Sequence, residues 1–341
     1  MKNNSFLALG EFMLRFSSEK GKSLSDFSSY QVNLGGAELN VAVVLSNFGI
    51  NAKVLSKVPD NSIGEGAIRE IKKQGVDTSL ILKGGERLGT YYLESGVGHK
   101  SSEVMYDRAH SSFASLRNEE VNWNTVFEGI TWFHWSGITP ALSQLAADLC
   151  KQAVLEAKKR NITISVDLNY RSKLWKYGVD PKEIMPELVK YCDVVVGNEG
   201  HNYLMLGIDP IKSFGYTHPE DYQEVCERVI SKFSNVKTVA FTVRETISAS
   251  HNKLQGILFS QGQFATTKLY NVSDIVDRIG SGDAFMAGLI YGLIKKEQST
   301  KLVDFATACA VLKHYHSGDF FIEKEEKIRS LYSEAGFDVK R

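Results

Sequence analysis

The sequence lacks an excess of either charge. Its 341 residues include 40 Lys and Arg and 40 Asp and Glu, so the formal net charge is zero. It also lacks a basic cluster long enough to follow a nucleic-acid backbone or to bind an anionic membrane surface. We therefore expect neither nucleic acid nor a membrane as a partner, and any anionic ligand has to be held by a local site.

Cysteine and long apolar runs are also scarce. The four cysteines are widely spaced and form no C-x-x-C pair, which favours reduced, packed thiols over disulfides or a zinc site. The longest apolar run, at 284–294, is far shorter than the ~20 residues that span a bilayer, and no signal peptide precedes Phe6. The expected location is the cytoplasm.

Two common phosphate-binding motifs are missing. The sequence contains no G-x-x-x-x-G-K-[ST], and no G-x-G-x-x-G follows the first predicted strand. Their absence disfavours a P-loop nucleotidase and a dinucleotide-dependent oxidoreductase.

The strongest candidate for a phosphate site is the stretch 277–288, which reads DRIGSGDAFMAG. Gly280, Ser281 and Gly282 form a tight turn before an apolar run that predicts a buried helix, so their amides would bind an anion at a helix N-terminus. Asp283 then lies beside that anion. It is either a helix cap or a general base that accepts the proton of an attacking hydroxyl group.

Strand and helix patterns alternate along most of the chain. Apolar strands of this kind are covered on both faces, which indicates a parallel sheet between two helical layers. Two segments, about 12–33 and 88–112, break the alternation and predict antiparallel strands that form a small projecting sheet. Residues 245–272 are also strand-like, and three helices follow at 284–296, 302–315 and 323–332. We expect one domain over residues 1–341.

Polar residues follow the end of a predicted buried strand. Asp167, Asn169 and Arg171 alternate toward one side at the place where open α/β sheets bind ligands. Tyr106 and Arg108 share one face of another strand, and Arg suits a carboxylate partner. The alternative for Arg108 is an ordinary surface residue.

A second glycine motif lies near the N-terminus. Gly35 and Gly36 precede a helical pattern that carries Asn40 one turn later. These groups would approach sugar hydroxyls closely, because glycine allows backbone contact. The alternative is a plain turn that enters a helix.

These motifs resemble the two signatures of the ribokinase-like (PfkB) carbohydrate kinases. The second signature is D-T-x-G-A-G-D, with Arg278 here for Thr and Ser281 for Ala, and NLGGAELNVA at 33–42 resembles the first. The similarity continues through most of 5–322. It implies a three-layer α/β/α fold with a central mostly parallel sheet and a small β-sheet lid over the sugar. The lid is often also a dimer contact, so a homo-oligomer is expected.

Other stretches resemble the 2-keto-3-deoxygluconate kinases within that family. They are YDRA at 106–109, DLNYRSKLW at 167–175, LKH at 312–314 and SGD at 317–319. This resemblance implies ATP-dependent transfer of a phosphoryl group to the 6-hydroxyl of the sugar acid, with Asp283 as the base. It implies sugar contacts for Tyr91, Tyr106, Arg108 and Arg171. The alternatives are a kinase for a neutral ketose such as fructose and a catalytically silent sugar or nucleotide sensor.

The family resemblance also implies the nucleotide site. It places the phosphates of ATP beside Thr242 and Arg244 and the adenine near the helix of Ala306, Ala310 and His314, although His314 is predicted to be a packed histidine. Relatives often carry Asn-x-x-Glu after a central strand, linked to magnesium and phosphate.

This chain departs from the Asn-x-x-Glu pattern. It has NEGH at 198–201, so Asn198 is expected to keep its role while His201 replaces the carboxylate. Magnesium is expected to bind together with ATP, and the sequence does not assign the residues that would coordinate it. Some relatives also bind a monovalent cation, such as K⁺, through carbonyls near Asp277 and Ile279.

Overall fold

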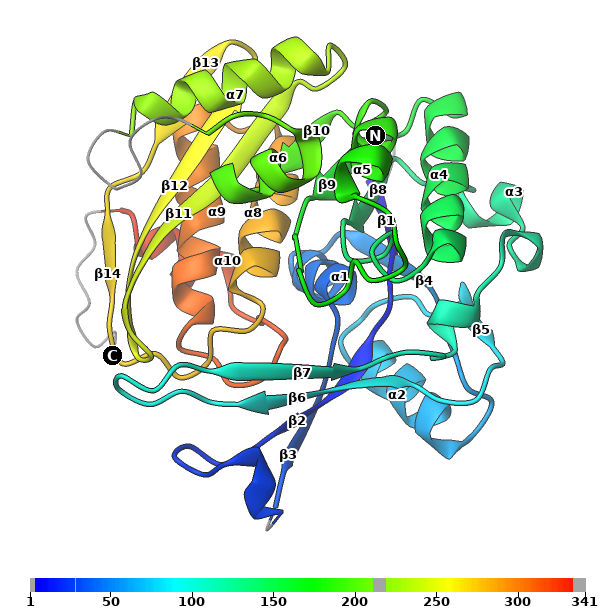
Figure 1. Cartoon of the computed structure of the whole chain (residues 1–341). Coiled ribbons are helices and arrows are strands. Elements are labelled where there is room, and N and C mark those ends of the chain that lie inside the picture. Colours follow the sequence, from blue (N-terminus) through cyan, green and yellow to red (C-terminus); the bar gives the residue numbers. More distant parts are fainter. Residues whose placement is uncertain (1–3, 28, 211–218, 334–341) are drawn as a thin grey trace.

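The computed structural model describes residues 4–27, 29–210 and 219–333. Its main sheet has the strand order β13-β12-β11-β10-β9-β8-β1-β4-β5, with β14 beside β12 (Figure 1). The strands are β1 (Ser5–Leu9), β4 (Asn51–Val58), β5 (Ile81–Lys83), β8 (Trp132–Ser136), β9 (Thr163–Asp167), β10 (Val194–Val196), β11 (Thr238–Ser248), β12 (His251–Ser260), β13 (Gln263–Thr266) and β14 (Tyr270–Val272). The strands from β11 to β5 run parallel, whereas β12, β13 and β14 add antiparallel pairs at one edge.

Helices cover both faces of this sheet (Figure 1). They are α1 (Ala37–Asn47), α2 (Ser62–Lys73), α3 (Trp123–Val126), α4 (Gln144–Lys159), α5 (Pro181–Val189), α6 (Glu199–Leu206), α7 (Asp221–Lys232), α8 (Ser281–Lys295), α9 (Ser299–Lys313) and α10 (Glu325–Ser330). Strand β1 shows why three layers form. Phe6 and Ala8 pack in the cluster that contains α1, α8 and α9, while Leu7 and Leu9 pack in the cluster that contains α4, α5 and α7. The predicted fold class is confirmed.

A separate small sheet lies across one end of the main sheet. Its order is β3 (Gln31–Gly35), β2 (Met13–Ser17), β6 (Gly89–Glu94) and β7 (Glu103–Asp107). The expectation that these strands are all antiparallel was wrong, because β2 and β6 pair in parallel. The chain passes through α1, β4, α2 and β5 between them, and this long crossover brings β6 back in the direction of β2.

Some helix boundaries also differ from the predicted ones. Helix α8 begins at Ser281, three residues before the apolar run, so Gly282 and Asp283 belong to its first turn. Helix α3 was not predicted, and neither was helix α6. Its start is capped by Asn198, whose Oδ1 accepts a hydrogen bond from the amide of His201 at 2.9 Å.

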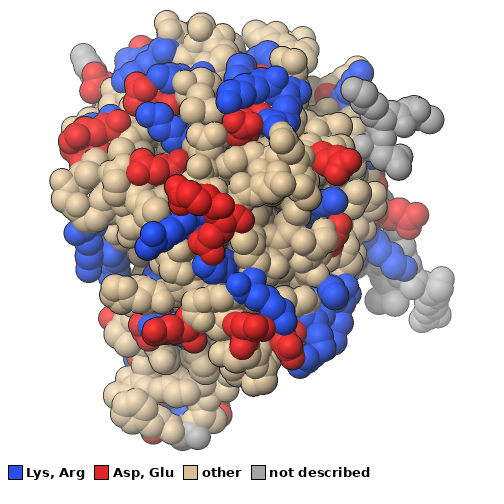
Figure 2. All heavy atoms as spheres, turned by 90° about the vertical axis from the view of Figure 1, so that its right-hand side faces the viewer, with Lys and Arg blue, Asp and Glu red and all other residues tan. Residues whose placement is uncertain are grey.

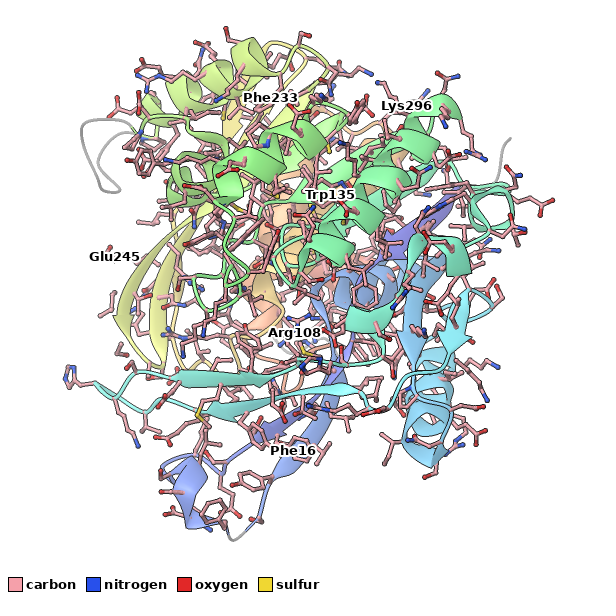
Figure 3. The ribbon with its side chains drawn as sticks, turned by 45° about the vertical axis from the view of Figure 1, so that its right-hand side comes forward. Phe16, Arg108, Trp135, Phe233, Glu245 and Lys296 are labelled. Carbon is pink, nitrogen blue, oxygen red and sulfur yellow. The ribbon has the colours of Figure 1, made fainter. Side chains whose placement is uncertain are left out.

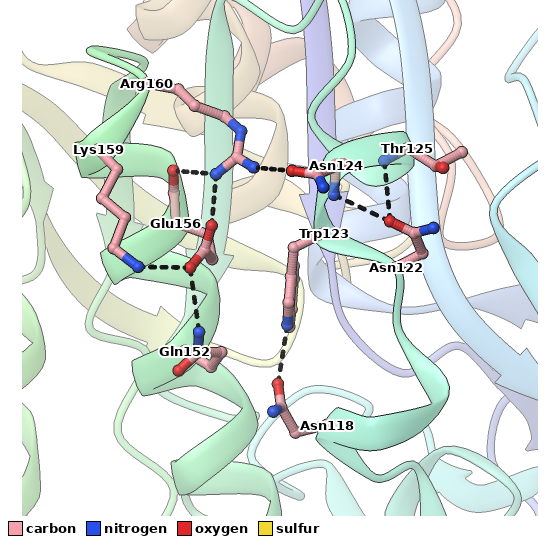
Figure 4. Close-up of polar contacts among 9 residues, drawn as sticks. All are labelled: Asn118, Asn122, Trp123, Asn124, Thr125, Gln152, Glu156, Lys159 and Arg160. Carbon is pink, nitrogen blue, oxygen red and sulfur yellow. Dashed lines mark hydrogen bonds and ion pairs between the residues drawn. The ribbon is translucent and has the colours of Figure 1, made fainter.

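Residues 109–131 return the chain from the small sheet to β8, and Arg160 at the end of α4 fastens this segment. Its guanidinium donates to Glu156 Oε2 at 2.5 Å and to Asn124 Oδ1 at 2.6 Å (Figure 4). Trp123 donates to Asn118 Oδ1 at 2.8 Å in the same segment. The bond to Asn124 ties this returning segment to the end of α4.

The surface carries mixed charge. On the face shown in Figure 2, Lys and Arg alternate with Asp and Glu rather than gathering in one patch. Among the described residues, no helix is both long and apolar enough to cross a membrane. The four cysteines are buried and free.

Candidate active site

A cavity of about 950 Å³ opens at the carboxyl ends of the parallel strands, beneath the small sheet. Residues from β6 and β7 line one side of it, and residues from β9, β10, β11 and the first turn of α8 line the other. Figure 3 shows Arg108 on the side of the small sheet that faces the main body and Phe16 on the opposite side. A site in this position matches the rule that open α/β sheets bind ligands at their carboxyl edge.

The glycine turn at 280–282 forms one wall of the cavity. Gly280 has φ +84°, and a Cβ atom there would lie 2.4 Å from the carbonyl oxygen of Asp319, so only glycine fits. The amide of Ala284 makes the first helical bond to Gly280 at 2.9 Å, which leaves the amides of Gly282 and Asp283 outside the helical ladder. A Cβ at Gly282 would meet no atom within 4 Å. The turn therefore presents main-chain donors to open space.

Asp283 is joined to the first glycine motif. Its Oδ2 accepts a hydrogen bond of 2.6 Å from Nδ2 of Asn40, a residue 243 positions earlier. Oδ1 of Asn40 in turn accepts a bond of 3.3 Å from the amide of Gly36. Among the described residues, this bond to Asn40 is the only hydrogen bond of the Asp283 side chain. The carboxylate therefore faces the cavity and α1 rather than capping its own helix.

Burial and neighbouring carboxylates raise the pKa values of two aspartates in the cavity. Burial raises the pKa of Asp283 to about 7, with further contributions from Asp167 and Glu38, while Asn40 and Arg171 oppose the shift. Burial likewise raises the pKa of Asp167 to about 6. A carboxyl group that titrates near neutral pH is well matched to accepting and releasing a proton.

Two buried glutamates support this region and were missed in the sequence. Glu38, on the first turn of α1, accepts bonds from Ser136 at 2.6 Å and Thr139 at 3.3 Å, and burial raises its pKa. Glu11 follows β1 and is only 5% exposed. A buried Glu after a strand has no distinctive sequence signal, because the partners that satisfy it are distant in the chain.

Arg108 and Arg171 both line the cavity but differ in their surroundings. Arg108 is buried, and its Nε and Nη2 lie 2.8 Å and 2.5 Å from Oε2 of Glu11. Its charge is thus largely balanced within the protein. Arg171 is exposed, and its guanidinium donates only a long bond of 3.4 Å to the carbonyl of Tyr170 among the described residues. Of the two, Arg171 is the better placed to bind an incoming carboxylate.

The inner face of the small sheet contributes two tyrosines. Tyr91 and Tyr106 are register partners on β6 and β7, and their ring centroids are 6.1 Å apart. The hydroxyl of Tyr91 donates to Oδ1 of Asp319 at 2.6 Å. Asp319 also lines the cavity and was missed as a site residue, although the sequence pattern SGD at 317–319 included it.

The side of the cavity formed by β11 and the start of α6 carries several side-chain nitrogen atoms. Thr242 and Arg244 reach it from β11, and Asn198 and His201 from the start of α6. Burial lowers the pKa of His201 to about 4, and its Nδ1 has no hydrogen-bond partner among the described residues. Arg278, which was not predicted as a site residue, also lines the cavity and donates to the carbonyl of Ser248.

A metal ion finds no ready cage in this part of the protein. Among the described residues, no group of three or more His, Cys, Asp or Glu side chains could hold one. Asp277 accepts bonds from the amides of Ile279 at 3.0 Å and Gly318 at 3.1 Å. The monovalent cation predicted near Asp277 and Ile279 therefore stays a prediction.

Of the residues predicted to act in catalysis or to contact the sugar, the phosphates or a cation, all but one line this single cavity. The predicted residues that do so are Gly36, Asn40, Tyr91, Tyr106, Arg108, Asp167, Arg171, Asn198, Thr242, Arg244, Asp277, Ile279, Gly280, Ser281, Gly282 and Asp283. Gly35 does not, because the Asp319 carboxylate occupies the space beside it, 2.2 Å from the position of a Cβ. Ala310 lines the cavity, whereas His314 is buried and bonds to the carbonyl of Ala310 at 2.7 Å.

A three-layer α/β/α fold, a small sheet over its carboxyl edge and an aspartate beside a glycine-rich helix start together define a carbohydrate kinase of the ribokinase-like class. The model of the pfkB family carbohydrate kinases matches residues 3–323, so the chain belongs to that family.

Individual relatives are similar over nearly their full length. The chain is 30% identical over 334 residues to a 2-dehydro-3-deoxygalactonokinase from Haloferax volcanii, covering 97% of this chain and 98% of the relative. It is 25% identical to a 2-dehydro-3-deoxygluconokinase from Bacillus subtilis, covering 96% and 95%. The crystal structure of 2-dehydro-3-deoxygluconokinase from Thermotoga maritima superimposes with a TM-score of 0.91 at 38% identity, covering 96% and 99%.

Proposed function

We propose that this enzyme uses ATP to phosphorylate the 6-hydroxyl group of 2-keto-3-deoxygluconate, giving 2-keto-3-deoxy-6-phosphogluconate. The observation that carries the proposal is one cavity that holds both Asp283, beside free main-chain amides, and Arg171, an exposed cation suited to a carboxylate. The names of the relatives from Bacillus subtilis and Thermotoga maritima support the same acid.

In this proposal Asp283 accepts the proton of the 6-hydroxyl as its oxygen attacks the γ-phosphorus of ATP. The new O–P bond forms as the bond from phosphorus to the bridging oxygen breaks, and ADP leaves with the electron pair. Among the amides at 280–282, that of Gly282 binds the transferring group where negative charge develops, because the amide of Ser281 already donates to the carbonyl of Arg278. Asn40 holds the carboxylate of Asp283 at 2.6 Å in the orientation that faces the acceptor.

The sugar acid is bound beneath the small sheet. Arg171 pairs with its carboxylate, assisted by Arg108, while Tyr91 and Tyr106 cover the carbon chain. Asp167 and the backbone at Gly36 contact hydroxyl groups in this arrangement, and Gly35 acts through the packing of Asp319. This division of roles follows the exposures and contacts of each side chain.

The nucleotide lies against β11 and the start of α6. Thr242, Arg244 and Asn198 contact its phosphates, together with the amides of Gly280 and Gly282. Magnesium accompanies ATP and supplies neutralisation of phosphate charge when bound. The absence of a carboxylate cage in the described residues agrees with an ion that keeps several waters.

The small sheet also forms a dimer contact in this proposal. Its outer face carries a row of register partners across all four strands, namely Val32, Phe16, Tyr92 and Met105. Val32 is 51% and Met105 47% exposed, which is unusual for large apolar side chains in a row. We place the enzyme in the cytoplasm, where its four free cysteines stay reduced.

The decisive experiment measures ADP release with 2-keto-3-deoxygluconate, 2-keto-3-deoxygalactonate and fructose. We expect the gluconate to give the highest kcat/KM. A preference for the galactonate, as the name of the Haloferax volcanii relative suggests, would change the epimer but keep the class of substrate. A preference for fructose would establish the neutral-ketose alternative. Binding of acid and ATP without ADP release would establish a sensor.

The same assay in Na⁺ and in K⁺ salts tests the monovalent cation.

A further inference from the structure

Four charged side chains meet where the small sheet packs on the main body, and two of them, Arg15 and Lys313, have had no role so far. Arg15, on β2 of the small sheet, is 1% exposed, and Lys313, at the end of α9, is fully buried. The carboxylates of Asp277 and Asp319 lie with them. Two cations and two anions thus share one interior position where the small sheet meets the main body.

Arg15 joins the two carboxylates. Its Nη2 donates to Oδ2 of Asp277 at 2.7 Å, and its Nε lies 3.3 Å from Oδ2 of Asp319. Its register partners on the inner face are Asn33 and Tyr91, and Tyr91 donates to the same Asp319. Three strands of the small sheet therefore direct polar side chains at this position, and Arg15 is at the centre.

Asp277 transmits this contact to the glycine turn. Its Oδ1 accepts the amide of Ile279 at 3.0 Å, and its Oδ2 accepts the amide of Gly318 at 3.1 Å as well as Arg15. The bond to Ile279 sets the direction of the backbone one residue before Gly280. A shift of the Asp277 carboxylate would therefore move the amides that face the transferring group.

Asp319 touches both glycine motifs. Its carboxylate lies against Gly35, where a Cβ would be 2.2 Å from Oδ1, and its carbonyl oxygen lies against Gly280, where a Cβ would be 2.4 Å away. Residues of the sugar side and the phosphate side of the cavity are thus packed on one aspartate. Arg15 and Tyr91 hold that aspartate in place.

We propose that Arg15 is a positioning residue that ties the small sheet to the glycine turn, so that docking of this sheet sets the alignment of Asp283 and the amides at 280–282. The inference deepens the proposed function and rests on it. Arg15 itself does not line the cavity and needs no contact with either substrate. Small displacements of reacting groups, of about 1 Å, are enough to cost on the order of 10²-fold in rate.

The test compares Arg15→Lys with the double variant Arg15→Met/Asp277→Asn. Lys keeps the charge but cannot span the two carboxylates. The double variant keeps the buried charges balanced, and the side-chain amide introduced at position 277 can still accept the backbone amide of Ile279 through its oxygen. We expect kcat to fall about 5–10-fold for Arg15→Lys and about 10²-fold for the double variant, with a smaller change in the KM for ATP.

The melting temperature separates positioning from general support of the fold. A merely structural role predicts that kcat recovers whenever the melting temperature does, so variants that melt like the wild type yet turn over slowly support positioning. Asp277→Asn alone should lower kcat to a value within about threefold of that of the double variant. Both variants lose the same contact, the ion pair between Arg15 and Asp277. The matched control is Arg87→Met. Arg87 lies beside the small sheet and outside the cavity, and its guanidinium is 2.9 Å from the carboxylate of Asp107.

The experiment on Arg15 can fail or succeed independently of the proposed substrate. Each variant is assayed with whichever acceptor the wild-type enzyme phosphorylates best, so failure of 2-keto-3-deoxygluconate as a substrate does not affect the comparison. The inference would be overturned if Arg15→Lys and the double variant both had a kcat within twofold of the wild-type value. Losses that simply multiply between Arg15→Met and Asp277→Asn would overturn it too, since the two residues would then act independently.

Discussion

At the scale of single residues, the proposed chemistry of this kinase centres on Asp283. The carboxylate is held by Asn40 in a cavity where burial, Asp167 and Glu38 raise its pKa to about 7. The raised pKa is favourable for a base that has to release its proton after each turnover. It is unfavourable for the stability of the fold, because ionising a buried acid costs free energy.

Replacing Asp283 by Asn therefore has two expected effects. The kcat should fall about 10²–10⁴-fold, the usual contribution of a general base. The melting temperature at pH 8 should rise by about 2–4 °C, because the variant no longer ionises a group whose folded pKa is above its unfolded value. The gain should shrink as the pH falls from 7 toward 4, where the wild-type carboxyl is protonated in the folded state. Measurements are steady-state kinetics and calorimetry from pH 5 to 8.

The control for this variant is Asp148→Asn, an exposed residue of α4 that lies outside the cavity. It should change neither quantity. In the wild-type enzyme, kcat/KM should rise with pH through an inflection near 7. A flat profile from pH 5.5 to 8, or an Asp283→Asn enzyme with wild-type kcat, would contradict the role of this carboxylate.

Arg171 gives a second prediction at the residue scale. Replacing Arg171 by Met should raise the KM for the sugar acid about 10–100-fold, because a hydrogen bond to a charged group is worth about 1.5–3 kcal/mol. The KM for ATP should change little. Lys176→Met removes an exposed cation of the same segment and serves as the control. Equal effects of both variants on the KM for the acid would show general electrostatics instead of a contact.

Arg108 is less suited to such an experiment. Its guanidinium lies 2.8 Å and 2.5 Å from a Glu11 oxygen in a buried pair, so its removal leaves an unpaired buried charge. Breaking such a pair typically costs about 3–5 kcal/mol of stability. A kinetic effect of Arg108→Ala is therefore to be interpreted only beside its melting temperature.

At the scale of elements, the two glycines at the start of α8 differ: Gly280 is required by the backbone, whereas Gly282 leaves space in the cavity. Gly280→Ala should destabilise the fold by about 1–3 kcal/mol, because φ is +84° and a Cβ would lie 2.4 Å from the Asp319 carbonyl. Gly282→Ala has room in the protein, so the melting temperature should not fall. Its methyl group should instead hinder the phosphates and raise the KM for ATP about tenfold. Thermal unfolding and steady-state kinetics of both variants check this, and a stability loss in Gly282→Ala would refute it.

The small sheet supplies the second prediction at this scale. If its outer row packs against a second copy, then Met105→Lys and Val32→Lys should weaken the dimer, because each buries a charge in an apolar contact. Light scattering after size-exclusion chromatography measures the mass. Ile63→Lys, at a 53% exposed residue of α2, is the matched control. Dimers that persist in both small-sheet variants, or a monomeric wild type, would exclude this contact.

At the scale of the whole molecule, one sheet is shared by two hydrophobic clusters. Alternate residues of β1, such as Phe6 and Leu7, belong to opposite clusters, so neither helical layer can lose its packing without affecting the other. We propose on this basis that residues 1–341 form one domain, and we expect a single cooperative thermal transition. Far-ultraviolet circular dichroism and tryptophan fluorescence should give the same midpoint. Two separated midpoints would indicate independent units.

The sequence predicted the main elements of this architecture because the signals are local. Apolar strands, helical periodicity and glycine stops depend on residues a few positions apart. They predicted the alternation of strands and helices, and they placed the last three helices, α8, α9 and α10, to within three residues. The two glycine motifs likewise predicted Gly36, Asn40, Gly280, Gly282 and Asp283 as cavity residues. Helices α3 and α6 were missed. The parallel pairing of β2 with β6 was not foreseen, because it depends on the crossover between them.

What the sequence determined by itself was the set of candidate groups: an aspartate after a glycine turn, an arginine on one strand and an arginine after another. Only the tertiary structure decided which of these groups are free to act. It paired Arg108 with Glu11 and left Arg171 exposed, and it placed Asp319 beside Gly35. The physical reason is that charge balance and burial are set by partners far away in the chain. Arg15 and Asp277, 262 positions apart, meet only when the small sheet packs on the main body.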